Sequence, residues 1–153
     1  MSDMILEHYA REALALDQRG YEQRVHNKPR GFWVSVKGED DWPSWCRSEK
    51  FAVGSLGVRH AVTLAEHANI LHLGNVSDIL DFHGEYSENL SYYLSHEQEH
   101  INWELVAEQY DGIIIAPYQW SLRLGDNAPW YYSWDVASGC IWSVEAISEV
   151  TAQ

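Results

Sequence analysis

The chain has 153 residues, of which 46% are hydrophobic and 22% charged, a composition typical of one globular domain spanning residues 1–153. No apolar run approaches the roughly 20 residues needed to span a bilayer, and the amino-terminal stretch has no basic start of a signal peptide. We therefore expect a cytoplasmic protein that does not enter a membrane, and its net charge of −13 opposes long-range attraction to nucleic acid.

The first half of the chain predicts short strands and one helix. Alternating or β-branched apolar runs predict strands at residues 4–9, 31–36, 60–64 and 70–73. A helix is expected to begin after Asp41, because aspartate is a good N-cap and Pro43 suits an early helical position.

The second half adds two helices and several buried strands. Helices are predicted at residues 77–86 and 101–110, and strands at 113–116, 130–134 and 140–144. In the second helix, Trp103, Leu105 and Val106 are expected to pack into the core. The sum predicts an α+β fold of short mixed or antiparallel strands with three or four short helices and no regular βαβ alternation.

The stretch from His96 to His100 spells H-E-x-x-H, the pattern of a zinc-hydrolase helix. Such a helix places both histidines on one face as zinc ligands, with the glutamate as general base. The same letters fit a capped helix start, with Ser95 as N-cap and Gln98 three residues later. We favour the structural interpretation, because no third ligand is marked, and we predict no metal site.

Charge is distributed unevenly along the chain. Residues 1–59 contain nine of the ten basic residues together with nine acids, whereas residues 60–153 contain fourteen acids and only Arg123. The simpler interpretation, which we favour, is that these acids keep the domain in solution. The asymmetry also motivates an alternative function: a non-catalytic acidic phage protein that binds and inhibits a basic host protein, even as a DNA mimic.

Two stretches near the amino terminus suggest a cleft. His8 stands at a strand end, and Trp33 and Ser35 share one face of the next strand at period-two spacing. If these strands are neighbours, the three residues form a cleft floor, and Arg30 or Lys28 at its rim is suited to hold a phosphate. A buried histidine beside a packed aromatic strand explains the same residues, and the residues alone favour that alternative.

Several motifs along the chain carry a family resemblance. They are HY at 8–9, KPRGFWVS at 28–35, WPSWC at 42–46, YDGI at 110–113 and WDVASGCIW at 134–142. Over most of its length the chain resembles a set of uncharacterised phage and actinobacterial proteins. The order of these motifs is similar to that of the ADP-ribosyltransferase superfamily.

That resemblance implies an ADP-ribosyltransferase-like fold, NAD as substrate and a host protein or nucleic acid as target, in the host cytoplasm if the protein is phage-encoded. His8, with Tyr9 beside it, matches the histidine that hydrogen-bonds the ribose and nicotinamide end of NAD. Ser35 and Trp33 match the element that supports the nicotinamide pocket, and Arg30 is the phosphate-binding candidate.

The sequence lacks the glutamate that often begins a later strand in the superfamily. The predicted strand at 113–115 has no glutamate, so Asp111 just before it is the candidate acid, with Asp135 as another. In a transferase this acid orients the ribose hydroxyl while positive charge grows on the sugar. Without such an acid, the fold is expected only to bind a nucleotide or a partner.

Overall fold

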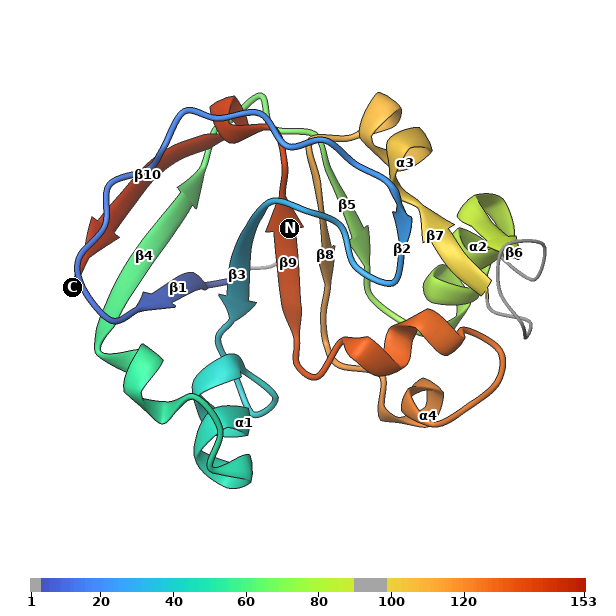
Figure 1. The fold of residues 1–153 in the computed structure, drawn as a ribbon, viewed down its shortest axis with the longest axis horizontal. Helices are drawn as coiled ribbons and strands as arrows, with labels where there is room; N and C mark the ends of the chain where they lie inside the picture. The colour runs from blue at the N-terminus through green and yellow to red at the C-terminus, as the bar shows by residue number, and fades with distance from the viewer. Residues whose placement is uncertain (1–3, 90–98) are drawn as a thin grey trace.

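The computed structural model describes residues 4–89 and 99–153 as one α+β domain (Figure 1). The strands are β1 (Leu6–Ala10), β2 (Val25–His26), β3 (Phe32–Val36), β4 (Val58–Leu64), β5 (Ile70–Leu73), β6 (Ser87–Asn89), β7 (Glu99–Asn102), β8 (Gly112–Ile115), β9 (Ser138–Ile141) and β10 (Ile147–Ala152). The α-helices are α1 (Trp42–Glu49), α2 (Val76–Tyr86), α3 (Trp103–Gln109) and α4 (Trp120–Arg123), and the 3-10 helices are η1 (Val53–Leu56), η2 (Pro129–Ser133) and η3 (Val144–Ala146).

The strands form two sheets. The larger has seven strands in the order β10-β4-β1-β3-β9-β8-β5, and the smaller has three in the order β2-β7-β6. Only β5 and β8 pair in parallel among the strands that the structure describes; the other pairs are antiparallel. Figure 1 shows α1 and α4 at one end of the larger sheet, whereas the long connection from β1 to β2 passes along the opposite end.

Most of the predicted strands form near their expected positions, whereas the sequence patterns do not predict β2, β6, β7 or β10. β1, β3, β4 and β5 agree with prediction to within a few residues, because each combines apolar or β-branched residues with flanking turn residues. β8 is buried at all four positions, as expected for a continuous apolar run between neighbouring strands.

The start of α1 also follows from local chemistry. The Asp41 carboxylate accepts a hydrogen bond from the Ser44 main-chain N–H at 3.0 Å, and Pro43 occupies the first turn. The helix ends at Lys50, which adopts a left-handed conformation with φ of 54°.

The core is built around the indole of Trp103, which has no exposed surface. Its ring lies 5.7 Å from the centroid of Phe82 on α2, and 6.4 Å from those of both Trp130 and Trp134. Its Nε1–H donates to the His26 main-chain oxygen at 3.0 Å, so the same residue also connects the core to strand β2 of the smaller sheet. Aromatic rings in these tilted and edge-on arrangements contribute both buried area and favourable quadrupole contacts.

The predicted aromatic strand at 130–134 is wrong, because Pro129–Ser133 form the 3-10 helix η2. Pro129 supplies a fixed φ that suits a helical start, and the Ser133 hydroxyl donates back to the Trp130 carbonyl at 2.8 Å. The buried rings of Trp130 and Trp134 favour this turn over an extended segment because it turns both toward Trp103. The predicted strand at 140–144 is shifted instead, with β9 ending at Ile141.

The second predicted helix begins later than expected. Ile101 and Asn102 belong to β7, and α3 begins at Trp103 with the Asn102 side chain accepting from the Leu105 N–H at 3.3 Å. Trp103 and Val106 are fully buried as predicted, but Leu105 is 45% exposed because it lies on the outer face of this short helix.

The H-E-x-x-H stretch does not form a helix where the structure describes it. Glu99 and His100 lie in strand β7, while Ser95, His96, Glu97 and Gln98 are outside the described residues. Residues 95–98 of the predicted helix start therefore lie outside the described residues. For Glu99 and His100 the predicted helix is wrong, because both belong to a strand. Among residues 4–89 and 99–153, no helix is both long and apolar enough to cross a membrane.

Two glycine substitutions test this packing. A Cβ added at Gly139 in β9 would lie 2.7 Å from the Ile113 main-chain oxygen, whereas a Cβ at Gly84 on α2 would meet nothing within 4 Å. We expect Gly139→Ala to destabilise the protein by about 1–3 kcal/mol through overpacking. Gly84→Ala should stabilise it by about 0.5–1 kcal/mol, because alanine loses less backbone conformational entropy than glycine when the helix folds. Urea unfolding measures both, and equal stabilities would contradict the described pairing of β8 and β9.

Candidate functional site

A pocket of about 380 Å³ opens on one face of the larger sheet, near α1. Its lining residues come from β1, β3, β9 and the connections around them: Glu7, His8, Tyr9, Lys28, Trp33, Val34, Ser35, Trp42, Ser55, Trp134, Asp135, Val136 and Ser138. Its volume lies near the lower end of the range for small-molecule sites. The pocket is therefore large enough for a nucleoside-sized group.

Strand register decides which side chains face this pocket. β1 and β3 are antiparallel neighbours, as the cleft hypothesis required, with Glu7 opposite Ser35 and Leu6 opposite Val36. Directly opposite residues of an antiparallel pair project to the same face, and side chains alternate along each strand. Glu7 therefore shares the pocket face with Ser35, and by the same alternation with Tyr9 and Trp33.

Glu7 is a buried carboxylate at the pocket wall, with only 5% of its surface exposed. The Tyr9 hydroxyl donates to its Oε1 at 2.7 Å, and the Arg59 Nε lies 3.6 Å from its Oε2. Burial, together with this hydrogen bond and the charge of Glu7, raises the pKa of the Tyr9 phenol. A buried carboxylate with one strong donor and one cation is fixed in position while it keeps acceptor capacity for a ligand.

Indole rings form much of the remaining wall. The Trp33 and Trp134 rings meet edge to face with centroids 5.1 Å apart, and the Trp134 Nε1–H reaches the Asn27 main-chain oxygen at 3.3 Å. The third indole, Trp42, is positioned by its main-chain N–H, which donates to the Ser35 hydroxyl at 2.9 Å. Ser35 therefore serves as an acceptor that holds a wall residue in place.

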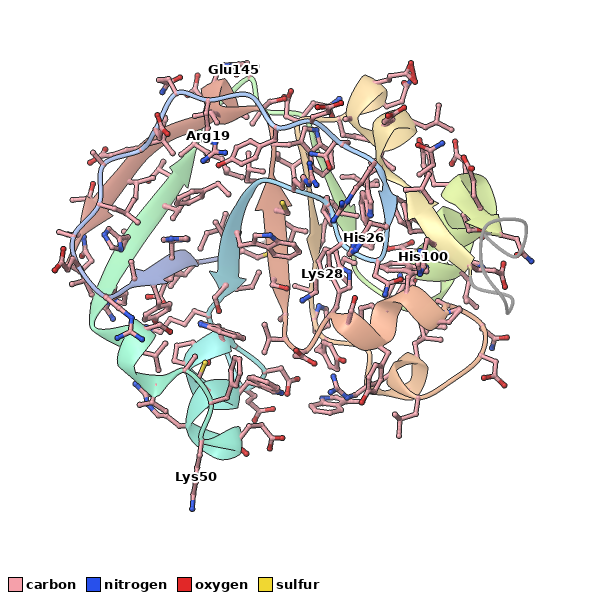
Figure 2. The ribbon with its side chains drawn as sticks, in the orientation of Figure 1. Arg19, His26, Lys28, Lys50, His100 and Glu145 are labelled. Carbon is pink, nitrogen blue, oxygen red and sulfur yellow. The ribbon has the colours of Figure 1, made fainter. Side chains whose placement is uncertain are left out.

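Lys28 closes one side of the pocket from the connection between β2 and β3 (Figure 2). Its Nζ lies 5.6 Å from the Trp33 ring centroid, within cation–π distance. Burial lowers the pKa of Lys28, and the nearby Asp135 carboxylate acts in the opposite direction. Asp135 also lines the pocket and pairs with the Arg123 guanidinium at 3.1 Å.

His8 borders the pocket, but its imidazole belongs to the other face of the sheet. The ring stacks on Phe32 with centroids 4.2 Å apart and lies 6.0 Å from the ring of buried His60. Its Nδ1 is 2.6 Å from the Trp33 main-chain oxygen, to which it donates. The expected convergence of the His8 imidazole and the Ser35 hydroxyl is therefore not met, because adjacent positions on a strand alternate faces.

Two other predicted site residues lie outside the pocket lining. Asp111 precedes β8, and its carboxylate accepts from the Asn69 N–H at 2.9 Å, a contact that fixes the entry of a strand. Arg30 is exposed, and its main chain exchanges two hydrogen bonds with the Gln23 side chain, at 2.6 and 3.0 Å. Tyr9, Trp33, Ser35 and the alternative acid Asp135 are brought together around the pocket.

Sequence reasoning missed Glu7. Its sequence signal is the period-two spacing to Tyr9 within the first strand, which places the two side chains on the same face. That signal becomes useful only when the register with β3 is known, because a slip of one residue would exchange Glu7 for His8.

The described part of the chain shows neither a metal-ligand cluster nor an activated thiol. Within residues 4–89 and 99–153, no group of three or more histidine, cysteine, aspartate or glutamate side chains is placed to hold a metal ion. Cys46 and Cys140 are free and buried, and burial raises the pKa of both thiols. A thiol with a raised pKa is a poor nucleophile near neutral pH.

Comparison of the chain with protein-family models, curated proteins and solved structures finds no match. The chemistry of the site is therefore inferred from the residues that line the pocket. Three indole rings and two carboxylates, of Glu7 and Asp135, line the pocket, and each carboxylate is paired with an arginine, Arg59 or Arg123. Indole faces and carboxylates both favour positive charge. Lys28 supplies one cation at the edge for an anionic group.

The hydrogen bond between Tyr9 and Glu7 can be tested by removing one hydroxyl. Tyr9→Phe leaves the buried Glu7 Oε1 without its 2.7 Å donor, so we expect a loss of about 1–3 kcal/mol in unfolding free energy. Tyr132→Phe is the control, because Tyr132 is 56% exposed and a surface change of this kind has little effect. Equal urea midpoints for the two variants would contradict a buried, hydrogen-bonded Glu7.

The position of His8 predicts a pH dependence of stability. Burial, reinforced by nearby His60, lowers the pKa of His8 in the folded state, so below about pH 6.5 the unfolded chain binds more protons at this residue. The contribution of His8 to stability is therefore complete above that pH and declines as the pH falls. His8→Phe cannot titrate, so its unfolding free energy should fall less than that of the wild type between pH 7 and pH 5. An equal or larger fall in the variant would contradict a half-buried, neutral imidazole.

Proposed function

We propose that this pocket binds NAD and that the protein is an ADP-ribosyltransferase-like enzyme that modifies a host macromolecule. The observation that carries the proposal is the buried carboxylate of Glu7 in a pocket walled by Trp33, Trp42 and Trp134. In this proposal Glu7 takes the role of the acid that the resemblance to ADP-ribosyltransferases requires, and the fold is a variant of theirs.

The nicotinamide end of NAD suits this pocket because its ring is planar and positively charged. Indole faces attract cations through their quadrupole, and a site that excludes water strengthens the attraction. Glu7 and Asp135 add negative charge at the pocket wall, although Arg59 neutralises part of the charge of Glu7 and Arg123 part of that of Asp135. The pocket volume of about 380 Å³ suits the nicotinamide–ribose half, with the other half extending beyond the mouth.

The reaction breaks the bond between the nicotinamide nitrogen and the ribose C1′. The bonding electron pair leaves with nicotinamide, which becomes neutral, while positive charge develops on the ribose. Glu7 accepts a hydrogen bond from a ribose hydroxyl and stabilises that charge through its own negative charge. A nucleophilic atom of the target then donates a lone pair to C1′ and releases its proton to solvent.

Two further pocket residues have roles in this scheme. Lys28, at the pocket edge, is placed to pair with a phosphate of NAD. Ser35 acts as a positioning residue, because its hydroxyl accepts from the Trp42 N–H and so holds an indole wall. The imidazole of His8 is assigned a structural role, since it stacks on Phe32 on the other face of the sheet.

Calorimetric titration with NAD and transfer of label from labelled NAD in a host lysate test the proposal. We expect wild-type protein to bind NAD and to label a lysate component. Glu7→Gln keeps the size and hydrogen-bonding capacity of the side chain but removes its charge, so it should still bind NAD. Its transfer rate should fall about 10²- to 10³-fold, as when one electrostatic stabiliser of a transition state is removed.

His8→Gln is the matched control, because it changes the neighbouring position on the same strand but the opposite face. Its transfer rate should stay within a few-fold of wild type, provided that its urea midpoint shows a folded protein. Absence of heat with NAD together with absence of label transfer would overturn the proposal. Salt-sensitive capture of a basic host protein would then favour the non-catalytic acidic inhibitor suggested by the fourteen acids after residue 60.

A further inference from the structure

The mouth of the pocket is bordered by a surface that the proposed chemistry does not use. We call it the aromatic lip and define it by Trp42, Trp45 and Phe51 together with the cations Arg47 and Lys50. Trp42 belongs both to the lip and to the pocket wall, so the two are continuous. We propose that the aromatic lip binds single-stranded nucleic acid and presents it to the pocket as the acceptor, an inference that rests on the proposed function.

The lip is a preformed stack of rings. The Trp42 and Trp45 rings are nearly parallel, with centroids 5.5 Å apart and an angle of 12° between their planes. Phe51 meets Trp45 edge to face at 5.5 Å and remains 53% exposed. Trp42 and Trp45 are half-buried, so Phe51 is the most exposed ring of the three. Exposed aromatic rings are the platforms on which unpaired bases stack, whatever their sequence.

The backbone holds Phe51 in this exposed position. Lys50 and Ala52, on either side of it, both adopt left-handed conformations, with φ of 54° and 49°. Such conformations are unfavourable for residues other than glycine and persist where the surrounding structure requires them. The Phe51 N–H also donates to the Cys46 carbonyl at 2.9 Å, so the exposed ring stands on a fixed turn.

Two exposed cations, Arg47 and Lys50, belong to the lip. Arg59 lies nearby in sequence, but it pairs with Glu7 at 3.6 Å and so is not counted with them. Figure 2 shows Lys50 projecting from the end of α1 away from the body of the protein. Arg11 adds a further cation, because its guanidinium lies beside Gly54 in η1.

Nearby acids offset only part of this charge: Glu49 lies between the two cations in sequence, and the charge of Arg47 lowers the pKa of Asp41. Glu39 and Asp40, which precede α1, line a second pocket with Lys37 and His72 instead of the first. Asp41 is buried and uses its carboxylate to cap α1. The lip therefore presents stacked rings and cations together, the combination that complements bases and phosphates.

Single strands fit this surface better than duplexes or acidic peptides. A duplex keeps its bases stacked inside, so its base faces cannot reach the rings, and its length would bring phosphates against the acidic remainder of the chain. An acidic peptide would pair with the cations but would leave the stacked rings without planar partners. The acceptor atom is then a nucleophilic nitrogen of a base or a terminal phosphate oxygen, which attacks C1′ as nicotinamide leaves.

The test uses fluorescence anisotropy with labelled single-stranded DNA and RNA of about twelve nucleotides, in the absence of NAD. We expect the full-length protein to bind these probes at low salt and to bind the matching duplex more weakly. Phe51→Ala should weaken binding about 5- to 100-fold, the range for loss of one stacking contact. Phe51→Tyr keeps a ring and should retain binding, which separates the loss of stacking from a general loss of structure.

Two more variants test whether binding depends on the lip. The double substitution Arg47→Glu and Lys50→Glu should weaken binding and reduce its salt dependence, because fewer counterions are then displaced. Leu124→Ala is the control, since Leu124 is 82% exposed but lies on the α4 side, and its binding should equal that of wild type. Equal binding by Phe51→Ala and Leu124→Ala, a preference for duplex, or binding only of an acidic peptide would each overturn the inference.

Separate measurement of NAD binding keeps the two proposals distinguishable. If NAD binds and label transfer to lysate protein is found while single strands do not bind, the transferase proposal stands and the acceptor inference fails. If single strands bind through the lip but NAD gives no heat, the proposed reaction fails and the inference of an acceptor site fails with it.

Discussion

The packing of the Trp103 indole is the interaction on which the rest of the structure depends. Its ring contacts Phe82, Trp130 and Trp134 and has no exposed surface, while its Nε1–H donates to the His26 carbonyl. One side chain thus joins α2, η2 and the smaller sheet. Because Trp134 is both a neighbour of Trp103 and a wall of the pocket, the packing of the core fixes the shape of the site.

Burial gives that site its electrostatic character. Glu7 has little exposed surface, so the charge of its carboxylate is screened weakly by water and is balanced locally by Tyr9 and Arg59. Lys28 is also partly desolvated, which lowers its pKa, and it lies over the Trp33 ring. Charges of both signs are therefore held at fixed positions around one cavity, an arrangement suited to a ligand that carries both signs, as NAD does.

The aromatic lip and the pocket differ in what their aromatic rings do. In the pocket, Trp33 and Trp134 pack against each other and are positioned from the core. On the lip, Phe51 is exposed and is positioned by a turn whose flanking residues have positive φ. The lip, proposed to bind a single strand, and the pocket are adjacent because Trp42, held by the Ser35 hydroxyl, belongs to both.

Local chemistry was sufficient for the α+β class and for the elements whose signals lie within a few residues, such as β5 and the capped start of α1. The same local patterns failed at residues 130–134, where buried indoles and Pro129 favour a 3-10 helix over the strand that β propensity predicts. They also placed Trp33 and Ser35 on one face of β3, and both line the pocket, because period-two spacing is a property of the strand itself. The His8 imidazole, expected beside them, lies on the other face.

The sequence by itself thus determined the class of fold and those short elements whose signals lie within a few residues, since these depend on nearest neighbours. Only the tertiary structure decided which residue of the first strand faces the pocket. The pairing of Glu7 with Ser35 turns the carboxylate inward and places the His8 imidazole on the other face. Tertiary structure also separated Asp111 from the pocket and brought Asp135 to it, because contacts between distant segments follow from register and core packing, which no local pattern records.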